Sequence, residues 1–351
     1  MRLILYILFI LMPMQMMAKS TLATTDIVDE QHLLKLLDEY IDRRELYTEQ
    51  KEEKIKQLKI KLRMAHNNAK RLSILDAIYR EYYTYNYDSA MVYANRGLAL
   101  ALTDNNTYFA TLNRINRAAV LSTGGLYSQA ETLLSEIGEK NVPQQLKQYY
   151  YYTTTWLYNY WESFCDKSEF KNHYRQKKLQ FLRLTVNTTH SNYVGLYAYL
   201  SGELAYLENP LGKDVLRHYT IAINNSPVNS RVHASAAYCI ARYNRELGNM
   251  QLYEKYIVEA AISDIVCPLK ENLALQELST YLYKKNPKYA NYAARYIYIS
   301  MEDAQFYNNR LRMLEISNIL PIIANANQEA LAHKERIVRG VLAVVSFLSL
   351  V

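Results

Sequence analysis

A short turn motif returns along this chain at intervals of about 40 residues, with one interval doubled. Each turn lies between two segments in which apolar residues recur with helical periodicity. The turns are Tyr85-Asn86-Tyr87, Gly125-Leu126-Tyr127, Asn209-Pro210, Gly248-Asn249 and Asn286-Pro287. Such a pattern is typical of helix–turn–helix units, which stack into a solenoid because one unit alone cannot bury its apolar face. We therefore predict an all-α fold of stacked antiparallel helix pairs.

The N-terminal residues 1–23 predict an export signal. A positive start at Met1-Arg2 precedes the unbroken apolar run 3–11. This run is too short to span a bilayer, which needs about 20 apolar residues, and small residues follow at the cleavage points Ala18 and Ala23. We expect the body of the protein to be exported to the periplasm; an uncleaved N-terminal anchor is the alternative.

The C-terminal residues 337–351 are also apolar, interrupted by Arg339, Gly340 and two serines. As a helix they would cover only about 22 Å, against roughly 30 Å of hydrocarbon. We expect them to be the start of a transmembrane helix that continues beyond residue 351 and holds the protein, as a single-pass anchor, on the periplasmic face of the inner membrane. A buried C-terminal helix that caps the solenoid is the alternative.

Composition and motifs argue against catalysis. The net charge of +7 is spread along the chain, which is weak support for nucleic-acid binding. The seven histidines and three cysteines show no metal-ligand spacing, and no HExxH, GxSxG, P-loop or GxGxxG motif occurs. Because function must be argued from a site, we predict no enzyme activity, no cofactor and no metal.

The periodicity divides the chain into four parts after the export signal. Residues 26–66 predict an N-terminal helical cap that packs on the first repeat, and 70–305 predict about six helix pairs. Residues 306–335 predict terminal helices, with a break at Pro321, ahead of the apolar tail. Ala118, Ala130 and Gly202 stand where helices of a pair are expected to cross, since small residues let two axes approach closely.

The repeat motif is plainest as Gly125-Leu126-Tyr127-Ser128-Gln129-Ala130, and it resembles the tetratricopeptide repeat (TPR). The spacing exceeds the roughly 34 residues of the standard unit. Several longer segments resemble a family of exported, membrane-anchored TPR proteins of Bacteroidetes, often labelled transcriptional regulators. The segments that carry this resemblance are 37–39, 51–55, 87–95, 260–265, 302–310 and 315–323.

The resemblance implies a periplasmic repeat region, one membrane span, and a cytoplasmic helix-turn-helix part that would contact DNA and is absent from this sequence. The predicted function is accordingly a non-enzymatic protein- or peptide-binding region, the periplasmic sensor part of a membrane-anchored transcriptional regulator that takes part in signal transduction. The alternative is a periplasmic scaffold or adaptor that assembles envelope proteins without signalling.

Tyrosine is unusually common, with 34 Tyr against 7 Phe and 2 Trp. Its apolar ring and polar tip suit a wet groove. In a TPR solenoid the first helix of each pair lines the concave face, where we expect a protein or peptide ligand, or a glycan fragment, to bind. Two arginines would favour an anionic group on that ligand. The residues expected in the groove are Tyr79, Tyr82, Tyr83, Tyr149, Tyr152, Trp156, Asn159, Tyr199, Tyr206, Tyr238, Arg242 and Arg245.

Overall fold

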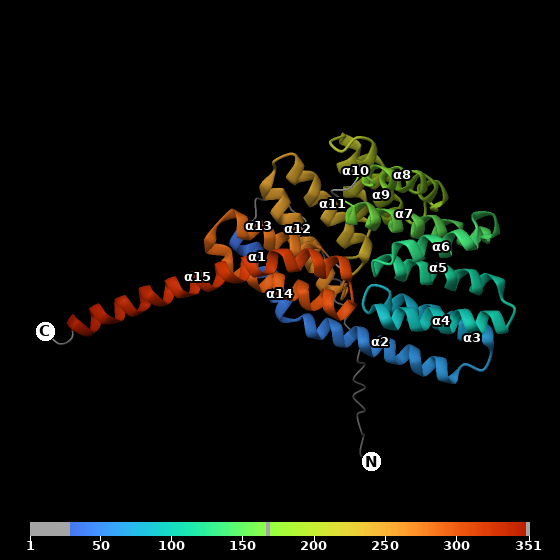
Figure 1. Ribbon diagram of the computed structural model, residues 1–351, viewed down its shortest axis with the longest axis horizontal. Coiled ribbons are helices and arrows are strands. Elements are labelled where there is room, and N and C mark those ends of the chain that lie inside the picture. Colours follow the sequence, from blue (N-terminus) through green and yellow to red (C-terminus); the bar gives the residue numbers. More distant parts are fainter. Residues whose placement is uncertain (1–28, 166–168, 272, 349–351) are drawn as a thin grey trace, which may run out of the picture.

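The computed structural model describes residues 29–165, 169–271 and 273–348, and every regular element in these ranges is helical (Figure 1). The expected export signal lies outside the described residues. The helices are α1 (Glu30–Asp42), α2 (Arg44–Met64), α3 (Asn68–Tyr82), α4 (Tyr87–Thr103), α5 (Thr107–Thr123), α6 (Tyr127–Ile137), α7 (Lys147–Phe164), α8 (Lys171–Thr188), α9 (Val194–Glu208), α10 (Lys213–Asn224), α11 (Arg231–Glu246), α12 (Met250–Val266), α13 (Ala274–Lys285), α14 (Ala290–Tyr307) and α15 (Arg310–Leu348), with short 3-10 turns at Glu139–Asn141, Gln144–Leu146 and Pro287–Tyr289.

Consecutive helices from α3 to α14 form antiparallel pairs, which confirms the predicted TPR-like solenoid. The recurring turns have a local cause. Asn86 caps α4 by accepting a hydrogen bond from the Ser89 amide over 2.9 Å. Gly125 and Gly248 take φ angles of 81° and 77°, which only glycine adopts without strain. The turn residues seen in the sequence therefore act as helix caps and reversals.

Gly202 lies where α9 crosses α10, as its small size predicts. A Cβ atom added there would lie 2.6 Å from two ring atoms of the fully buried Tyr219. We expect Gly202→Ala to lower the free energy of unfolding by about 2 kcal/mol, because overpacking of up to about 3 kcal/mol exceeds the gain of about 1 kcal/mol in helix propensity. Urea unfolding measures this change. The matched variant Gly340→Ala, in open space, should show no loss.

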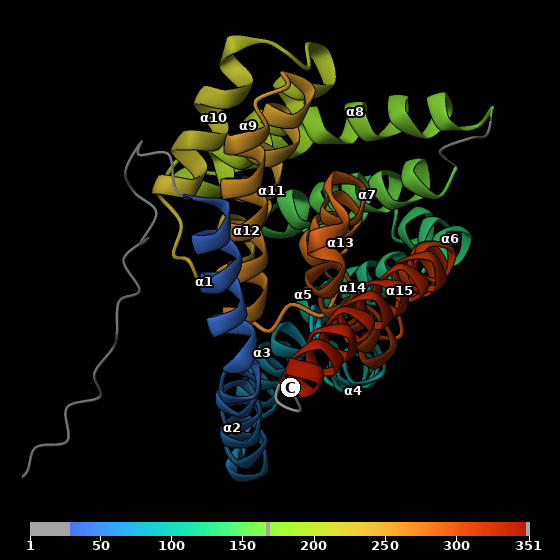
Figure 2. The same cartoon turned by 90° about the vertical axis from the view of Figure 1, so that its left-hand side faces the viewer.

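The solenoid returns on itself, so that its last pair touches its first (Figures 1 and 2). The hydroxyl of Tyr307, at the end of α14, donates to the Tyr83 carbonyl over 2.8 Å and contacts the Thr123 hydroxyl at 2.7 Å. In the connection between α12 and α13, the Lys270 amide donates to the Thr84 carbonyl over 2.9 Å. The C-terminal helices therefore contact the first repeats and narrow the concave face on which the sequence predicted the ligand.

The N-terminal helices behave differently from each other. α2 packs on α3, as the predicted cap would, whereas α1 packs along α12 (Figure 2). Polar contacts fasten α1 to the last repeat, since Arg295 of α14 forms ion pairs with Asp38 and Asp42, and Lys285 of α13 with Glu30. The prediction that this whole segment caps the first repeat was wrong for α1, because its apolar stripe finds its partner on α12 instead.

The terminal helices expected on either side of Pro321 form one continuous helix, α15. Proline removes one hydrogen bond from the helix, but contacts of Leu311, Ile316 and Ile323 with the body hold the backbone helical on both sides of it. Among the described residues, no helix combines the length and apolar character needed to cross a membrane. The expected transmembrane start at 337–351 is thus not supported as a span.

Candidate functional site

The solenoid curves around a partly open cavity of about 250 Å³. The inner faces of α7, α9 and α11 form three sides, and the connection between α12 and α13 together with the first turn of α15 forms the fourth. First helices of pairs thus line the cavity, as the TPR architecture leads one to expect. The cavity is therefore the candidate site.

Aromatic rings form one wall. Tyr152, Trp156 and Tyr160 recur at one-turn intervals along α7 and so share its inner face. The Trp156 ring stacks on Tyr199 of α9, with centroids 6.2 Å apart and planes 11° apart, and meets Tyr152 edge-on at 5.9 Å. Tyr238 of α11 continues the wall. These rings offer flat apolar faces with polar edges to an occupant.

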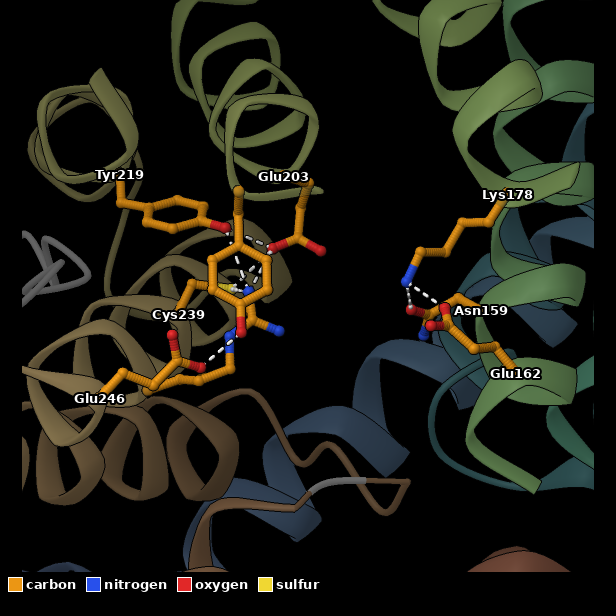
Figure 3. Close-up of polar contacts among 9 residues, drawn as sticks. Asn159, Glu162, Lys178, Glu203, Tyr219, Cys239 and Glu246 are labelled. Atoms are coloured by element: carbon orange, nitrogen blue, oxygen red, sulfur yellow. Dashed lines mark hydrogen bonds and ion pairs between the residues drawn. The ribbon is translucent and has the colours of Figure 1, made fainter. Parts of the chain in front are cut away.

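A buried polar cluster faces this wall from α9, α10 and α11 (Figure 3). Glu203 accepts hydrogen bonds at its Oε1 atom from Tyr219 at 2.5 Å, from Cys239 at 3.2 Å and from Arg242 at 3.0 Å. Burial acts to raise the pKa of the Glu203 carboxyl, but the Arg242 charge and the Tyr219 hydroxyl outweigh it and hold this pKa below its usual value. Arg242 also lies 3.9 Å above the Tyr206 ring. Glu203 is thus ionised and Arg242 fixed.

A second buried pair stands across the cavity on α7 and α8 (Figure 3). Lys178 forms an ion pair with Glu162 at 2.6 Å, and its ammonium group donates to Asn159 Oδ1 over 3.2 Å. Asn159 lines the cavity, while Lys178 and Glu162 support it from behind. The side chain of Asn159 is therefore held in one orientation toward the cavity.

The floor of the cavity is a polar junction between distant parts of the chain. Arg231 of α11 forms an ion pair with Glu271 and lies 5.3 Å above the ring of Tyr83 from α3. The Tyr160 hydroxyl accepts from Arg231 over 3.3 Å and donates to Glu271 over 3.2 Å. The junction thus joins α3, α7, α11 and the connection after α12, and it seals the ring.

Three buried hydrogen-bond donors on residues that line the cavity have no acceptor in the described part of the chain. Among the described residues, Trp156 Nε1, Arg242 Nε and Arg312 Nε have no hydrogen-bond partner. A buried donor without an acceptor carries a free-energy penalty, which an occupant with acceptor atoms would remove once a turn of the side chain brings the donor to the surface of the cavity. Asp264, also in the lining, has a pKa raised well above its usual value, first by burial and then by Glu271 and Asp303. Asp264 is therefore easier to protonate than an exposed carboxyl.

The structure sorts the predicted groove residues into three sets. The first set lines the cavity: Tyr152, Trp156, Asn159, Tyr199, Tyr238 and Arg242. The second set supports the lining or lies beside it: Tyr83 under Arg231, Tyr206 under Arg242, Tyr149 hydrogen-bonded to Asn116, and Arg245 paired with Glu277. The third set is Tyr79, which donates to the Asn116 carbonyl, and Tyr82, which stacks on Tyr93 and accepts from Lys59 in the core beneath α2.

Several lining residues escaped the sequence prediction. Glu203 follows Tyr199 by one helical turn, and Arg231 precedes Tyr238 by two, so periodicity could have placed both on the inner face. Glu271 and Arg312 carry no such signal, since they reach the cavity only because the ring closes. Within the described residues, no group of His, Cys, Asp or Glu side chains is arranged to hold a metal ion.

One constellation resembles a catalytic triad but lacks access. His233 Nδ1 lies 2.8 Å from the Ser263 hydroxyl, and its Nε2 lies 3.5 Å from Glu259. Ser263 is fully buried and donates to the Val228 carbonyl over 2.8 Å. A buried hydroxyl that is committed to a backbone acceptor cannot attack a substrate. The cluster therefore serves packing between α11 and α12.

This cluster makes stability depend on pH. Burial raises the pKa of Glu259 to about 7, above its usual 4.5, so the folded protein holds a proton that the unfolded chain releases. The contribution of this protonated carboxyl to the free energy of unfolding is complete below about pH 4.5 and is lost as the pH rises through 7. Between pH 5 and pH 8, we expect the free energy of unfolding to fall by about 2 kcal/mol more in the wild type than in Glu259→Gln. Urea titrations at both pH values measure this; equal slopes would contradict it.

Comparison with known proteins places the chain. Its residues 41–318 match the family model described as the SusR N-terminal TPR domain, and a search of curated proteins gives no match. The matched range runs from the end of α1 into the first turns of α15, so it contains every residue of the cavity lining. The repeat architecture and the match agree. This chain belongs to the SusR N-terminal TPR domain family, a Bacteroidetes family of TPR proteins.

Proposed function

We propose that this chain is a non-enzymatic binding domain whose internal cavity receives a small, hydroxyl-rich ligand such as a saccharide unit of a glycan fragment. TPR domains are in general protein-binding or scaffold modules, and family membership puts the chain in that class. The concave surface here narrows to a cavity of about 250 Å³, a volume that suits a small molecule better than an extended protein segment.

The single observation that carries the proposal is the mixture of uncommitted donors and acceptors beside flat aromatic faces. Trp156 Nε1, Arg242 Nε and Arg312 Nε have no acceptor among the described residues, while the hydroxyls of Tyr152 and Tyr199 in the lining can both donate and accept. A ligand hydroxyl likewise donates and accepts, so several hydroxyls on one ring satisfy both kinds of group at once. The aromatic rings of Tyr152, Trp156 and Tyr238 in the lining would cover the apolar face of such a ring.

The ion pairs around the cavity favour an uncharged ligand. Arg231 is paired with Glu271, Arg242 with Glu203, and Arg312 with Glu315, so each cation that lines the cavity already has its anion. An ionic ligand would have to displace one of these partners and leave it buried without a counter-charge. The anionic group that the two arginines led us to expect from sequence is therefore replaced by neutral hydroxyls in the proposal.

We further propose that the domain acts as a periplasmic sensor in a membrane-anchored regulator, as the sequence resemblance implies. The support is the shape of α15, which leaves the body as a long rod with exposed apolar side chains at its end, among them Val338, Val341 and Leu342 (Figure 1). Such a surface is typical of a helix that meets a membrane or another helix. A scaffold that assembles envelope proteins is the alternative, which needs no ligand in the cavity.

A ligand panel tests the binding proposal. Purified protein is heated with neutral mono- and disaccharides, with glycerol as a polyol control, and with dipeptides, each at matched millimolar concentration. A ligand present at tenfold its Kd stabilises the folded state by about 1.4 kcal/mol, so we expect at least one saccharide to raise Tm where glycerol does not. Dipeptides that raise Tm while every saccharide fails would overturn the assigned ligand class, and no shift at all would favour the scaffold.

A further inference from the structure

One side chain of the last helix reaches the cavity from outside the repeats. Arg312, in the first turn of α15, lines the cavity and is only 8% exposed. Its Nη1 donates to Glu315 Oε2 over 2.6 Å, and its Nε finds no acceptor within the described part of the chain. If the guanidinium turned toward the cavity, an occupant that accepts from this unsatisfied donor would gain a contact with α15 as well as with the repeats.

The rest of α15 would move together with its first turns. Buried anchors such as Leu311, Ile316 and Ile323 stand near its start, and the described side chains of residues 331–346 are all exposed. The helix projects away from the ring as one rod (Figure 1). A small change of direction at the anchored end is therefore a large displacement at the far end, because an α-helix is stiff over this length.

The junction before α15 is a turn of two residues, so a change in the direction of α15 would arise there. Asn308 ends α14 in the left-handed region with φ 68°, and Asn309 Oδ1 caps α15 by accepting from the Arg312 amide over 3.1 Å. Glu315 accepts from Gln276 of α13 at 3.3 Å as well as from Arg312. If Arg312 turned toward an occupant, Glu315 would thus keep a hydrogen-bond partner.

We infer that Arg312 is a positioning residue that couples occupancy of the cavity to the orientation of α15. An occupied cavity favours the arrangement in which Arg312 binds the occupant, and an empty one favours the arrangement seen here; the difference in contacts drives the shift. This inference rests on the proposed function. It adds the route by which a binding event in the repeats is passed on to α15. The matched family region ends at residue 318, in the first turns of the helix that would carry the change.

A tethered occupant tests the inference without a dissolved ligand. Ser235 of α11 lines the cavity, so Ser235→Trp places an aromatic face inside it, and such a face attracts a guanidinium. Hydrogen–deuterium exchange of peptides covering 310–320 reports the first turns of α15. Ser73→Trp, on an exposed face of α3, is the matched control. If Ser235→Trp loses its helical circular dichroism, Ser235→Phe takes its place.

We expect the tethered ring to change exchange in 310–320 by at least about threefold, while Ser73→Trp leaves it unchanged. The change should disappear when Ser235→Trp is combined with Arg312→Met, a dependence that simple packing of α15 would not produce. Unchanged exchange in a folded Ser235 variant, or the same change in the Arg312→Met background, would overturn the inference. Failure of the proposed function is read separately, from the saccharide panel.

Discussion

Replacing Arg231 with methionine is expected to lower the free energy of unfolding by about 3 kcal/mol, because it leaves the buried Glu271 carboxylate without its counter-charge. The Glu271 side chain is only 6% exposed, and the Arg231 side chain 27% exposed, which places the effect at the lower end of the range for buried pairs. The same change removes the contact with the Tyr83 ring and so weakens the closure of the solenoid.

Urea unfolding followed by circular dichroism measures this effect. Arg217→Met is the control, since Arg217 pairs with Asp214 at the exposed surface and should change stability by less than about 0.5 kcal/mol. Adding Glu271→Gln to Arg231→Met should recover part of the loss, because the second change removes the unpaired charge. Equal stability of Arg231→Met and the wild type would show that this junction does not hold the ring.

Trp156→Ala is expected to weaken binding of any saccharide that stabilises the wild type by at least about tenfold, equivalent to about 1.4 kcal/mol. The variant loses the ring that faces the cavity and the uncommitted Nε1 donor. Because Trp156 is half-buried and packs at the edge of the core, helix content should be retained, at a cost of about 2 kcal/mol in stability. Isothermal titration calorimetry measures the affinity and circular dichroism the fold.

Trp156→Phe separates the two contributions of this residue. It keeps a smaller aromatic face and removes the Nε1 donor with part of the indole ring, so the affinity should fall less than in Trp156→Ala, by about fivefold, roughly the value of one hydrogen bond. Tyr193→Ala is the matched aromatic control on an exposed surface. Unchanged affinity in Trp156→Ala would mean that the ligand binds elsewhere, and loss of helix content would mean that Trp156 is a core residue.

The architecture was predictable from sequence because its causes are local. Asn86 as a cap and Gly125 in a left-handed turn act within one repeat, so they leave a mark that periodicity analysis can find. Long-range closure leaves no such mark. That α1 would dock on α12, and that Tyr307 would reach Tyr83, follows from the accumulated twist of six pairs, which no short segment determines.

The same distinction between local and long-range causes explains which residues of the site could be predicted from sequence. Tyr152, Trp156 and Tyr199 were predicted because they stand on first helices and face inward. Tyr82 stands on a first helix too, but α2 covers its face, and no short segment of the sequence indicates where α2 packs. Glu271 and Arg312 belong to connections and to the last helix, so they enter the cavity only through closure of the ring.

The two ends of the solenoid meet, and their contact bounds one side of the cavity. Zero-length carbodiimide cross-linking followed by mass spectrometry tests it most directly. Lys285 of α13 lies 2.9 Å from Glu30 of α1, and Lys51 of α2 lies 3.4 Å from Glu81 of α3, which provides an internal control between neighbours. A closed ring gives both cross-linked peptides. Recovery of the Lys51–Glu81 product without the Lys285–Glu30 product would contradict closure.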